Sequence, residues 1–418
     1  MATTRISLAK GSSHVGIAAD VAMACLVGWA AYAMSCWLVP AGPTALTFGA
    51  QWQSMSEDPF RLFGQFPHRI LVPVLAWLFG QGGDGYLAFT HVLHMAMLAA
   101  AFFACRRLRG AVLDAVLVTL AVAITAPVQM YKVHWVGFAD PACFTLFLLM
   151  LAAARNPYVL WSLFLVNLFN HEMAAFFWPW LWFWRRRQDS RWRLDLACSA
   201  VAVAIYTGFY LYVRGAAQQD YTIDYFLANP LFPGGSFVVW NLAAVHWIVA
   251  FGPVLALLAW HQHRKGSGSD RWHLWLVLFG ILTVFCIAWD WARHSNLLVV
   301  PLIVASVPFL AQGGKNRVAY LVLLALTAFL LWLVPPWTST AWPTNELANL
   351  PLFAATEVIH LTPPPVVLES FGTLEASLNQ WLPAVWRPLS VIYAIGLTIW
   401  CAGWLWARCE NRAAGSAD

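Results

Sequence analysis

Long apolar segments separated by short charged ones run through most of the chain, and they restrict its fold more than any other feature. A helix needs about 20 mainly apolar residues to cross the hydrocarbon core of a bilayer. Only 10% of the 418 residues are charged, whereas soluble proteins carry roughly 25%. So much apolar surface cannot be buried in a water-soluble core. The sequence therefore predicts an all-α, polytopic transmembrane helical bundle that forms one integral membrane domain over residues 1–418.

About twelve apolar segments are expected to span the membrane. They lie at 20–40, 86–104, 111–129, 140–154, 157–170, 173–184, 195–213, 237–260, 272–290, 296–311, 317–334 and 388–407. Several are short, and 157–170 with 173–184 have the length of half-helices. The run RILVPVLAWLFG at 69–80 is too short to span a bilayer and precedes the polar sequence QGGDG. We expect it to form a juxtamembrane or re-entrant helix.

The Lys and Arg residues predict how the bundle is oriented. If the N-terminus lies inside the cell, the inside segments of the twelve spans hold 18 of the 24 Lys and Arg residues. The outer side then keeps only Arg61, Arg69, Lys132, Arg214, Arg293 and Arg387. Cytoplasmic loops of membrane proteins carry such an excess of positive charge. We therefore expect both termini in the cytoplasm (N-in/C-in).

The same threading predicts two long loops on the outer side. The first, 41–85, includes the short helix at 69–80, and the second, 335–387, is rich in Pro and Trp. Residues 409–418 are expected to be a disordered tail. Most acidic residues also fall on the outer side, although acids contribute little to topology and were not used to orient the chain. An ionisable surface is thus expected at the outer membrane boundary.

Two acidic and two basic residues of the first outer loop are candidates for a site there. Glu57 and Asp58 belong to the sequence SEDPF, and His68 and Arg69 open the juxtamembrane helix. Carboxylates near cationic groups at a lipid boundary suit acid–base chemistry on a substrate with a phosphate head group. The alternative is a solvated loop whose Arg and His mark the interface.

Two further turns of the outer side carry candidates. Asp140 stands in GFADP at the start of an apolar helix, where it suits the N-cap and Pro141 the first helical position, so capping would explain it. His171 and Glu172 separate two apolar runs in FNHEM. Ionisable residues at membrane depth usually mark a pathway or a site, although a water-exposed turn would also account for them.

The sequence WDWARHSN places Asp290 and Arg293 three residues apart at the end of another apolar run. An intrahelical ion pair is the simplest explanation. Arg293 also suits phosphate binding, because a planar guanidinium matches phosphate oxygens. The cysteines lie mostly in apolar runs without a CxxC motif, which argues against a zinc or disulfide framework. His91 and His94 share one helix face, but no matching pair elsewhere supports a haem site.

The order of these motifs resembles that of the GT-C-type bacterial membrane glycosyltransferases and GT-C-like proteins. In that family a long outer loop with acids follows the first helix, an R-x-L-x-P pattern comes next, and a D-x-x-R comes late. Here the pieces are HRILVPVLA (68–76), GFADP (137–141), NHE (170–172), and DWAR (290–293) followed by PLIV. The resemblance covers roughly residues 20–311.

The resemblance implies a helical bundle that transfers a sugar from a polyprenyl-phosphate donor on the outer side of the membrane. An acid of the first outer loop would be the base, here Asp58 or Glu57. Members often carry an Asp directly after the first helix, whereas this loop has no acid before Glu57. Asp140 and Glu172 are therefore the alternatives for the base. The residues expected to bind substrate are His68, Arg69, His171, Asp290 and Arg293.

The expected function is transfer of a sugar to an envelope or exopolysaccharide acceptor at the periplasmic face of the bacterial inner membrane. The expected partners are the lipid-linked sugar donor, a glycan or lipid acceptor, and membrane lipid. No basic-aromatic surface indicates nucleic-acid binding. No cofactor is implied, and a divalent metal ion stays open without a ligand set. Two other functions remain open: a transporter or flippase for a lipid-linked glycan, and a non-catalytic membrane subunit of a polysaccharide assembly machine.

Overall fold

The computed structural model describes residues 14–39, 47–64, 66–133, 135–189, 191–217 and 295–333, together with Leu258, Leu276 and Gly280. Within these ranges every regular element is a helix. The α-helices are α1 (His14–Leu38), α2 (Thr47–Glu57), α3 (Leu71–Leu78), α4 (Tyr86–Arg107), α5 (Val112–Ala123), α6 (Ala126–Val133), α7 (Asp140–Ala152), α8 (Pro157–Asn170), α9 (Trp178–Asp189), α10 (Trp192–Ala216), α16 (Val299–Leu310) and α17 (Gly314–Leu333). Four 3₁₀ helices connect them: η1 (Pro59–Arg61), η2 (Gly83–Gly85), η3 (Glu172–Phe177) and η4 (Ser295–Leu298).

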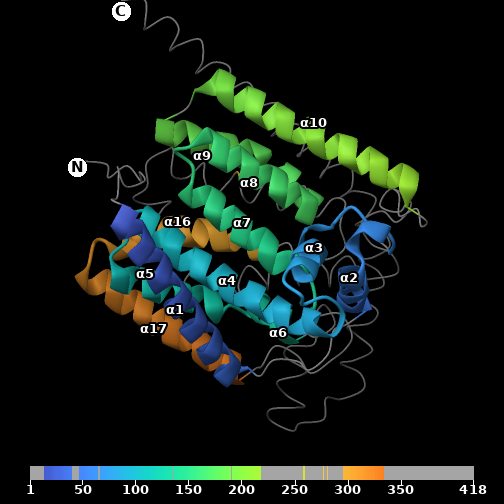
Figure 1. Ribbon diagram of the computed structural model, residues 1–418. Coiled ribbons are helices and arrows are strands. Elements are labelled where there is room, and N and C mark those ends of the chain that lie inside the picture. Colours follow the sequence, from blue (N-terminus) through green and yellow to red (C-terminus); the bar gives the residue numbers. More distant parts are fainter. Residues whose placement is uncertain are drawn as a thin grey trace, which may run out of the picture.

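The helices form a bundle in which neighbours in the sequence are often neighbours in space (Figure 1). From one side to the other, α1 packs on α4, α4 on α7, α7 on α8, and α8 on α10. Only a few residues separate α4 from α5, α7 from α8 and α16 from α17. Such short connections produce antiparallel neighbours. The short connections therefore lie at the two ends of the bundle. The helices α2 and α3 lie at one of these ends (Figure 1).

Among the described residues, three helices are long and apolar enough to cross a membrane, namely Gly16–Leu38, Gly83–Arg107 and Trp192–Ala216. Shorter apolar helices of 10–17 residues pack among them: α5, α7, α8 and the segment Asn296–Leu310. The all-helical fold predicted from the sequence is confirmed for the described residues, which include three candidate membrane-spanning helices. Apart from Leu258, Leu276 and Gly280, the expected spans at 237–260, 272–290 and 388–407, the loop at 335–387 and the tail at 409–418 lie outside the described residues.

Two of the expected segments differ from the helices. The segment 111–129 is divided, because α5 ends at Ala123 and α6 begins at Ala126. Thr125 stands at this break and donates its hydroxyl to Val122 O at 2.8 Å, and Pro127 suits the start of the next helix. The segment 173–184 is displaced, because η3 occupies 172–177 and α9 begins only at Trp178. The juxtamembrane helix expected at 69–80 is present as α3.

The helices α1 and α4 approach each other closely at Gly28. A Cβ added to Gly28 would lie 2.7 Å from Ala99 N and 2.9 Å from Met95 O. Small residues allow membrane helices to approach in this way. The crossing fixes α1 against α4, whose buried residues continue into the apolar core of the bundle.

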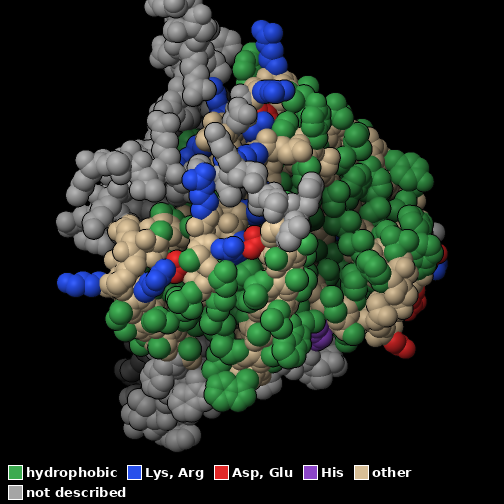
Figure 2. Space-filling model, turned by 60° about the vertical axis from the view of Figure 1, so that its left-hand side comes forward, with side chains coloured by type: hydrophobic (Ala, Val, Ile, Leu, Met, Phe, Trp, Pro, Cys, Tyr) green, Lys and Arg blue, Asp and Glu red, His purple; other side chains and the backbone are tan. Residues whose placement is uncertain are grey.

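Within the described residues, Lys and Arg gather at the end of the bundle opposite α2 and α3. Figure 2 shows Lys and Arg side chains gathered on the face that comes forward from the left of Figure 1. Three ion pairs join helices there: Arg106 Nε with Asp20 at 2.9 Å, Arg317 Nε with Asp114 at 2.8 Å, and Arg185 Nε with Asp195 at 3.0 Å. The last pair is fully buried, and Trp161 Nε1 also donates to Asp195 at 3.1 Å. These contacts hold the positive end together by linking α9 and α8 to α10, α4 to α1, and α17 to α5.

Candidate functional site

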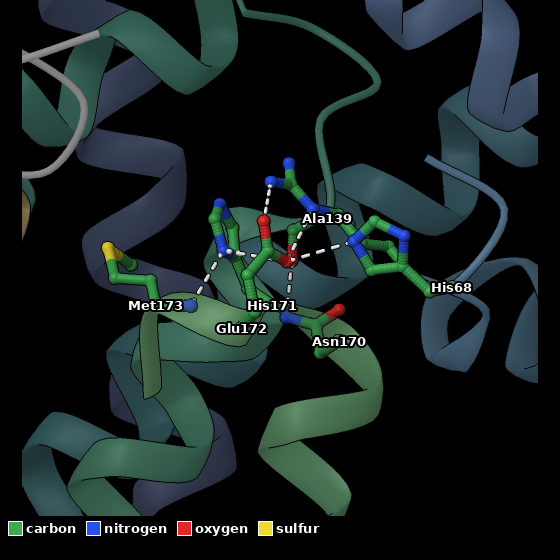
Figure 3. Close-up of polar contacts among 7 residues, drawn as sticks. His68, Ala139, Asn170, His171, Glu172 and Met173 are labelled. Atoms are coloured by element: carbon green, nitrogen blue, oxygen red, sulfur yellow. Dashed lines mark hydrogen bonds and ion pairs between the residues drawn. The ribbon is translucent and has the colours of Figure 1, made fainter. Parts of the chain in front are cut away.

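The candidate site lies where α3 begins and α8 ends, at the end of the bundle that carries α2. Four of the residues selected from the sequence meet there, and we call them the Glu172 cluster: His68, Arg69, His171 and Glu172 (Figure 3). They come from two segments about one hundred residues apart in the chain. The sequence HR before α3 therefore faces the sequence HE after α8.

The Glu172 carboxylate is the centre of this cluster. Its Oε2 accepts hydrogen bonds from Arg69 Nε at 2.9 Å and His68 Nε2 at 3.3 Å, and its Oε1 accepts from Arg69 Nη2. Such a two-point contact between guanidinium and carboxylate is among the stronger polar interactions in proteins. The Arg69 side chain is 5% exposed and that of Glu172 is 32% exposed. The pair is therefore buried on the arginine side and accessible on the carboxylate side.

Glu172 stays ionised in this environment. Burial raises the pKa of its carboxyl, but the positive charge of Arg69, with His171 and His68 beside it, outweighs burial and lowers the pKa well below its ordinary value of 4.5. A carboxylate with so low a pKa is a weak proton acceptor at neutral pH. The geometry favours a positioning and charge-balancing role for Glu172 over the role of base.

Each of the three residues of the NHE turn has a different structural role in the site. Asn170 Nδ2 donates to Ala139 O at 3.2 Å, which ties the end of α8 to the start of α7 (Figure 3). His171 has extended backbone (φ −158°, ψ 122°) and ends α8, and its Nδ1 accepts from Met173 N at 3.1 Å. Since that lone pair is used, the 3.6 Å approach of Nδ1 to Glu172 Oε2 is a contact and not a hydrogen bond. Glu172 then emerges beside Arg69.

Aromatic residues that sequence reasoning did not select line the cluster. The ring of Tyr210 stands edge-on to His68 at 5.2 Å, and the guanidinium of Arg69 lies 4.1 Å from the centroid of Phe66. Tyr206, one turn before Tyr210 on α10, has a buried hydroxyl with no hydrogen-bond partner among the described residues. In the sequence, the feature that could have pointed to Tyr206 and Tyr210 is their i, i+4 spacing on an apolar helix. Because tyrosines commonly anchor membrane helices, that signal does not single them out.

Asp140 is buried at the start of α7, with 1% of its surface exposed. It is the first helical residue rather than the expected N-cap, a position that Ala139 occupies. The side chains of Tyr86 and Cys143 interact electrostatically with Asp140. Cys143 also interacts electrostatically with Arg69 and Glu172. Tyr86 in turn donates its hydroxyl to Gly137 O at 2.9 Å, in the turn before α7. Asp140 is thus a buried acid at the start of α7, and Ala139 before it accepts the hydrogen bond from Asn170 that ties this start to the NHE turn.

The remaining candidates are not brought into the cluster. Glu57 and Asp58 are exposed at the end of α2, and no hydrogen bond or ion pair described by the structure joins either to Arg69 or Glu172. Glu57 lies against Gly83, where an added Cβ would come within 3.3 Å of its side chain. Asp290 and Arg293 lie outside the described residues.

Within the described ranges, no group of three or more His, Cys, Asp or Glu side chains is arranged to hold a metal ion. Comparisons with known protein families, with curated proteins and with solved structures found no match to this chain.

Proposed function

We propose that the protein is a membrane glycosyltransferase that takes a sugar from a polyprenyl-phosphate-linked donor and transfers it to an envelope or exopolysaccharide acceptor. In this proposal the chain has about twelve spans with both termini in the cytoplasm, and its active face is the periplasmic face of the bacterial inner membrane. The observation that carries the proposal is the Glu172 cluster. Ionisable residues are costly among apolar helices and are usually functional there, and this cluster lies at the end of the bundle that carries α2 and α3 (Figure 1).

The proposed reaction is a displacement at the anomeric carbon of the sugar. A carboxylate takes the proton from an acceptor hydroxyl, whose oxygen forms the new bond to the anomeric carbon. The bond from that carbon to the phosphate oxygen breaks, and its electron pair leaves with the polyprenyl phosphate. Asp140 is the favoured base, because Glu172 is committed to Arg69 and the two loop acids are exposed. In this proposal His68 and Arg69, which both contact the Glu172 carboxylate, supply the positive charge that stabilises the leaving phosphate.

The direct test uses the purified full-length chain in lipid nanodiscs. It would be supplied with a panel of polyprenyl-phosphate sugars, labelled in the sugar, and with envelope glycan fragments as acceptors. Transfer of label from one donor to acceptor is the expected result, and loss of transfer when donor is omitted is the control. If no donor gives transfer while a lipid-linked glycan crosses the bilayer in vesicles, the protein is a flippase and the proposal is wrong. If neither activity is found, a non-catalytic assembly role is favoured.

Reporter fusions test the proposed topology separately from the activity. A topology reporter fused at Gly313, in the turn between α16 and α17, should lie in the cytoplasm, and one fused at Gly80, after α3, in the periplasm. Fusions at Ser267 and Asn345 should report cytoplasm and periplasm respectively, since the Lys and Arg distribution places them so. Alkaline phosphatase and green fluorescent protein reporters give opposite signals on the two sides. A periplasmic signal from Gly313 would reverse the orientation and move the Glu172 cluster to the cytoplasmic face.

A further inference from the structure

A second group of polar side chains lies between α1, α4 and α6. This Lys132 cluster consists of Tyr32, Cys36, His91, His94 and Lys132. Tyr32 Oη lies 2.7 Å from His91 Nδ1, and the Tyr32 ring is 5.4 Å from the ring of His94. Lys132 Nζ lies 3.9 Å from Cys36 Sγ, one turn after Tyr32 on α1. None of these residues has a role in the glycosyl transfer proposed above.

Lys132 is a buried cation without a matching anion. Its side chain is fully buried, and no carboxylate among the described residues pairs with it. Its Nζ donates to Val39 O at 2.8 Å, directly after α1 ends. A cation at the end of a helix is favourable. An ammonium has three donors, and the bonds to Val39 O and Cys36 Sγ use two of them. Burial lowers the pKa of the amine to about 8, so most of it is protonated at neutral pH.

His94 gives an independent second observation. It is 2% exposed, and its Nε2 is buried with no hydrogen-bond partner among the described residues. Buried polar atoms without a partner are rare and costly in native proteins. Tyr32, Cys36 and His91 are half-buried, so the cluster extends from the protein surface to the buried Lys132 and His94. A buried imidazole nitrogen without a partner and a buried ammonium without a carboxylate partner among the described residues thus occur together, at the inner end of a polar group that begins at the surface.

We propose that the Lys132 cluster binds a phosphate group. A phosphate monoester supplies up to two negative charges and several acceptor oxygens, which match an ammonium, an imidazole N–H and a tyrosine hydroxyl. The phosphate can belong to a lipid or to a soluble ester. A lipid is the favoured source, because Trp29, Trp37 and Val92 on the same two helices are exposed apolar side chains that an acyl or prenyl chain can contact. The proposal does not depend on glycosyl transfer.

The experiment measures binding of dodecyl phosphate and of inorganic phosphate to the purified full-length chain in neutral detergent. Dodecyl phosphate is expected to raise the melting temperature saturably. Lys132→Met should weaken its binding about tenfold or more, since a hydrogen bond to a charged group is lost, whereas Lys132→Arg should retain most of it. The matched control is Lys315→Met, which removes an exposed lysine at the start of α17 and should bind like the wild type. Equal binding by wild type and Lys132→Met overturns the proposal.

The two probes separate the two sources of phosphate. Lys132-dependent binding of dodecyl phosphate alone identifies a lipid ligand, and equally tight Lys132-dependent binding of inorganic phosphate identifies a soluble one. A second measurement needs no variant and therefore covers the case in which Lys132→Met does not fold. Dodecyl phosphate carrying a diazirine next to the phosphate should label wild-type peptides that contain residues 32–36, 91–94 or 132. Labelling confined to other peptides overturns the proposal.

Discussion

Replacing Glu172 by Gln is expected to lower the rate of sugar transfer about 100-fold, the loss that a small misplacement of catalytic groups commonly produces. Arg69 depends on the Glu172 carboxylate for both of its short contacts, and its own side chain is only 5% exposed. A neutral amide leaves that charge without a counterion, so Arg69 and His68 should shift. The free energy of unfolding should also fall by about 2 kcal/mol, less than for a fully buried pair because Glu172 is partly exposed.

The same pair gives a pH dependence whose sign follows from the lowered pKa of Glu172. The unfolded chain binds a proton at this carboxyl at a higher pH than the folded chain does, so the stability from the pair is complete above the ordinary pKa. It is lost as the pH falls through the lowered pKa of the folded state. Thermal melts of the wild type should therefore drop more steeply below pH 4.5 than melts of Glu172→Gln.

Two further variants separate a functional cluster from a structural ion pair. Asp84→Asn removes an exposed acid of η2 and should change neither rate nor stability. The double variant Arg69→Met, Glu172→Leu replaces both partners with apolar groups, which often restores stability, but it should stay inactive. Full activity in Glu172→Gln, or in the stable double variant, would show that the pair only holds α3 to α8.

The sequence identified the residues of the Glu172 cluster as candidates, but it did not predict that they contact one another. HR at 68–69 and HE at 171–172 were separate candidates, each with an ordinary alternative explanation. Their contact depends on α3 lying across the end of α8, a long-range packing outcome that no local pattern encodes. Once the contact is known, the alternative of two unrelated solvated turns no longer holds for these four residues, because Arg69 and Glu172 satisfy each other.

Other features depended on packing in the same way. Lys132 was predicted to be one of six outer cations, and its burial follows from the ends of α1 and α6 meeting at Val39. The start of α9 was placed five residues too early, because an apolar run carries no signal that separates 3₁₀ from α-helical turns. The helix α3 could be predicted, since its length and the polar QGGDG after it are both local properties.

Removing the proposed base should have the largest effect of all. Asp140→Asn keeps the size of the side chain and much of its hydrogen bonding but cannot accept a proton at neutral pH. Loss of a general base commonly costs about 10²–10⁴-fold in rate. Binding of the lipid-linked donor should persist, because the variant leaves Arg69, Glu172 and His68 in place. We therefore expect a folded protein that binds labelled donor but transfers no sugar from it.

Comparing Asp140→Asn with variants of Asp58 and Glu57 identifies which of these acids is the base. Asp58→Asn and Glu57→Gln change exposed side chains at the end of α2, and the resemblance to GT-C enzymes assigns the base to one of them. If either abolishes transfer while Asp140→Asn retains it, α2 must supply the base, and Asp140 would be a buried structural acid beside Tyr86 and Cys143. If only Asp140→Asn abolishes transfer, the base lies at the start of α7. The reason to expect the second outcome is the hydrogen bond from Asn170 Nδ2 to Ala139 O at 3.2 Å, which joins the residue before Asp140 to the turn that carries His171 and Glu172.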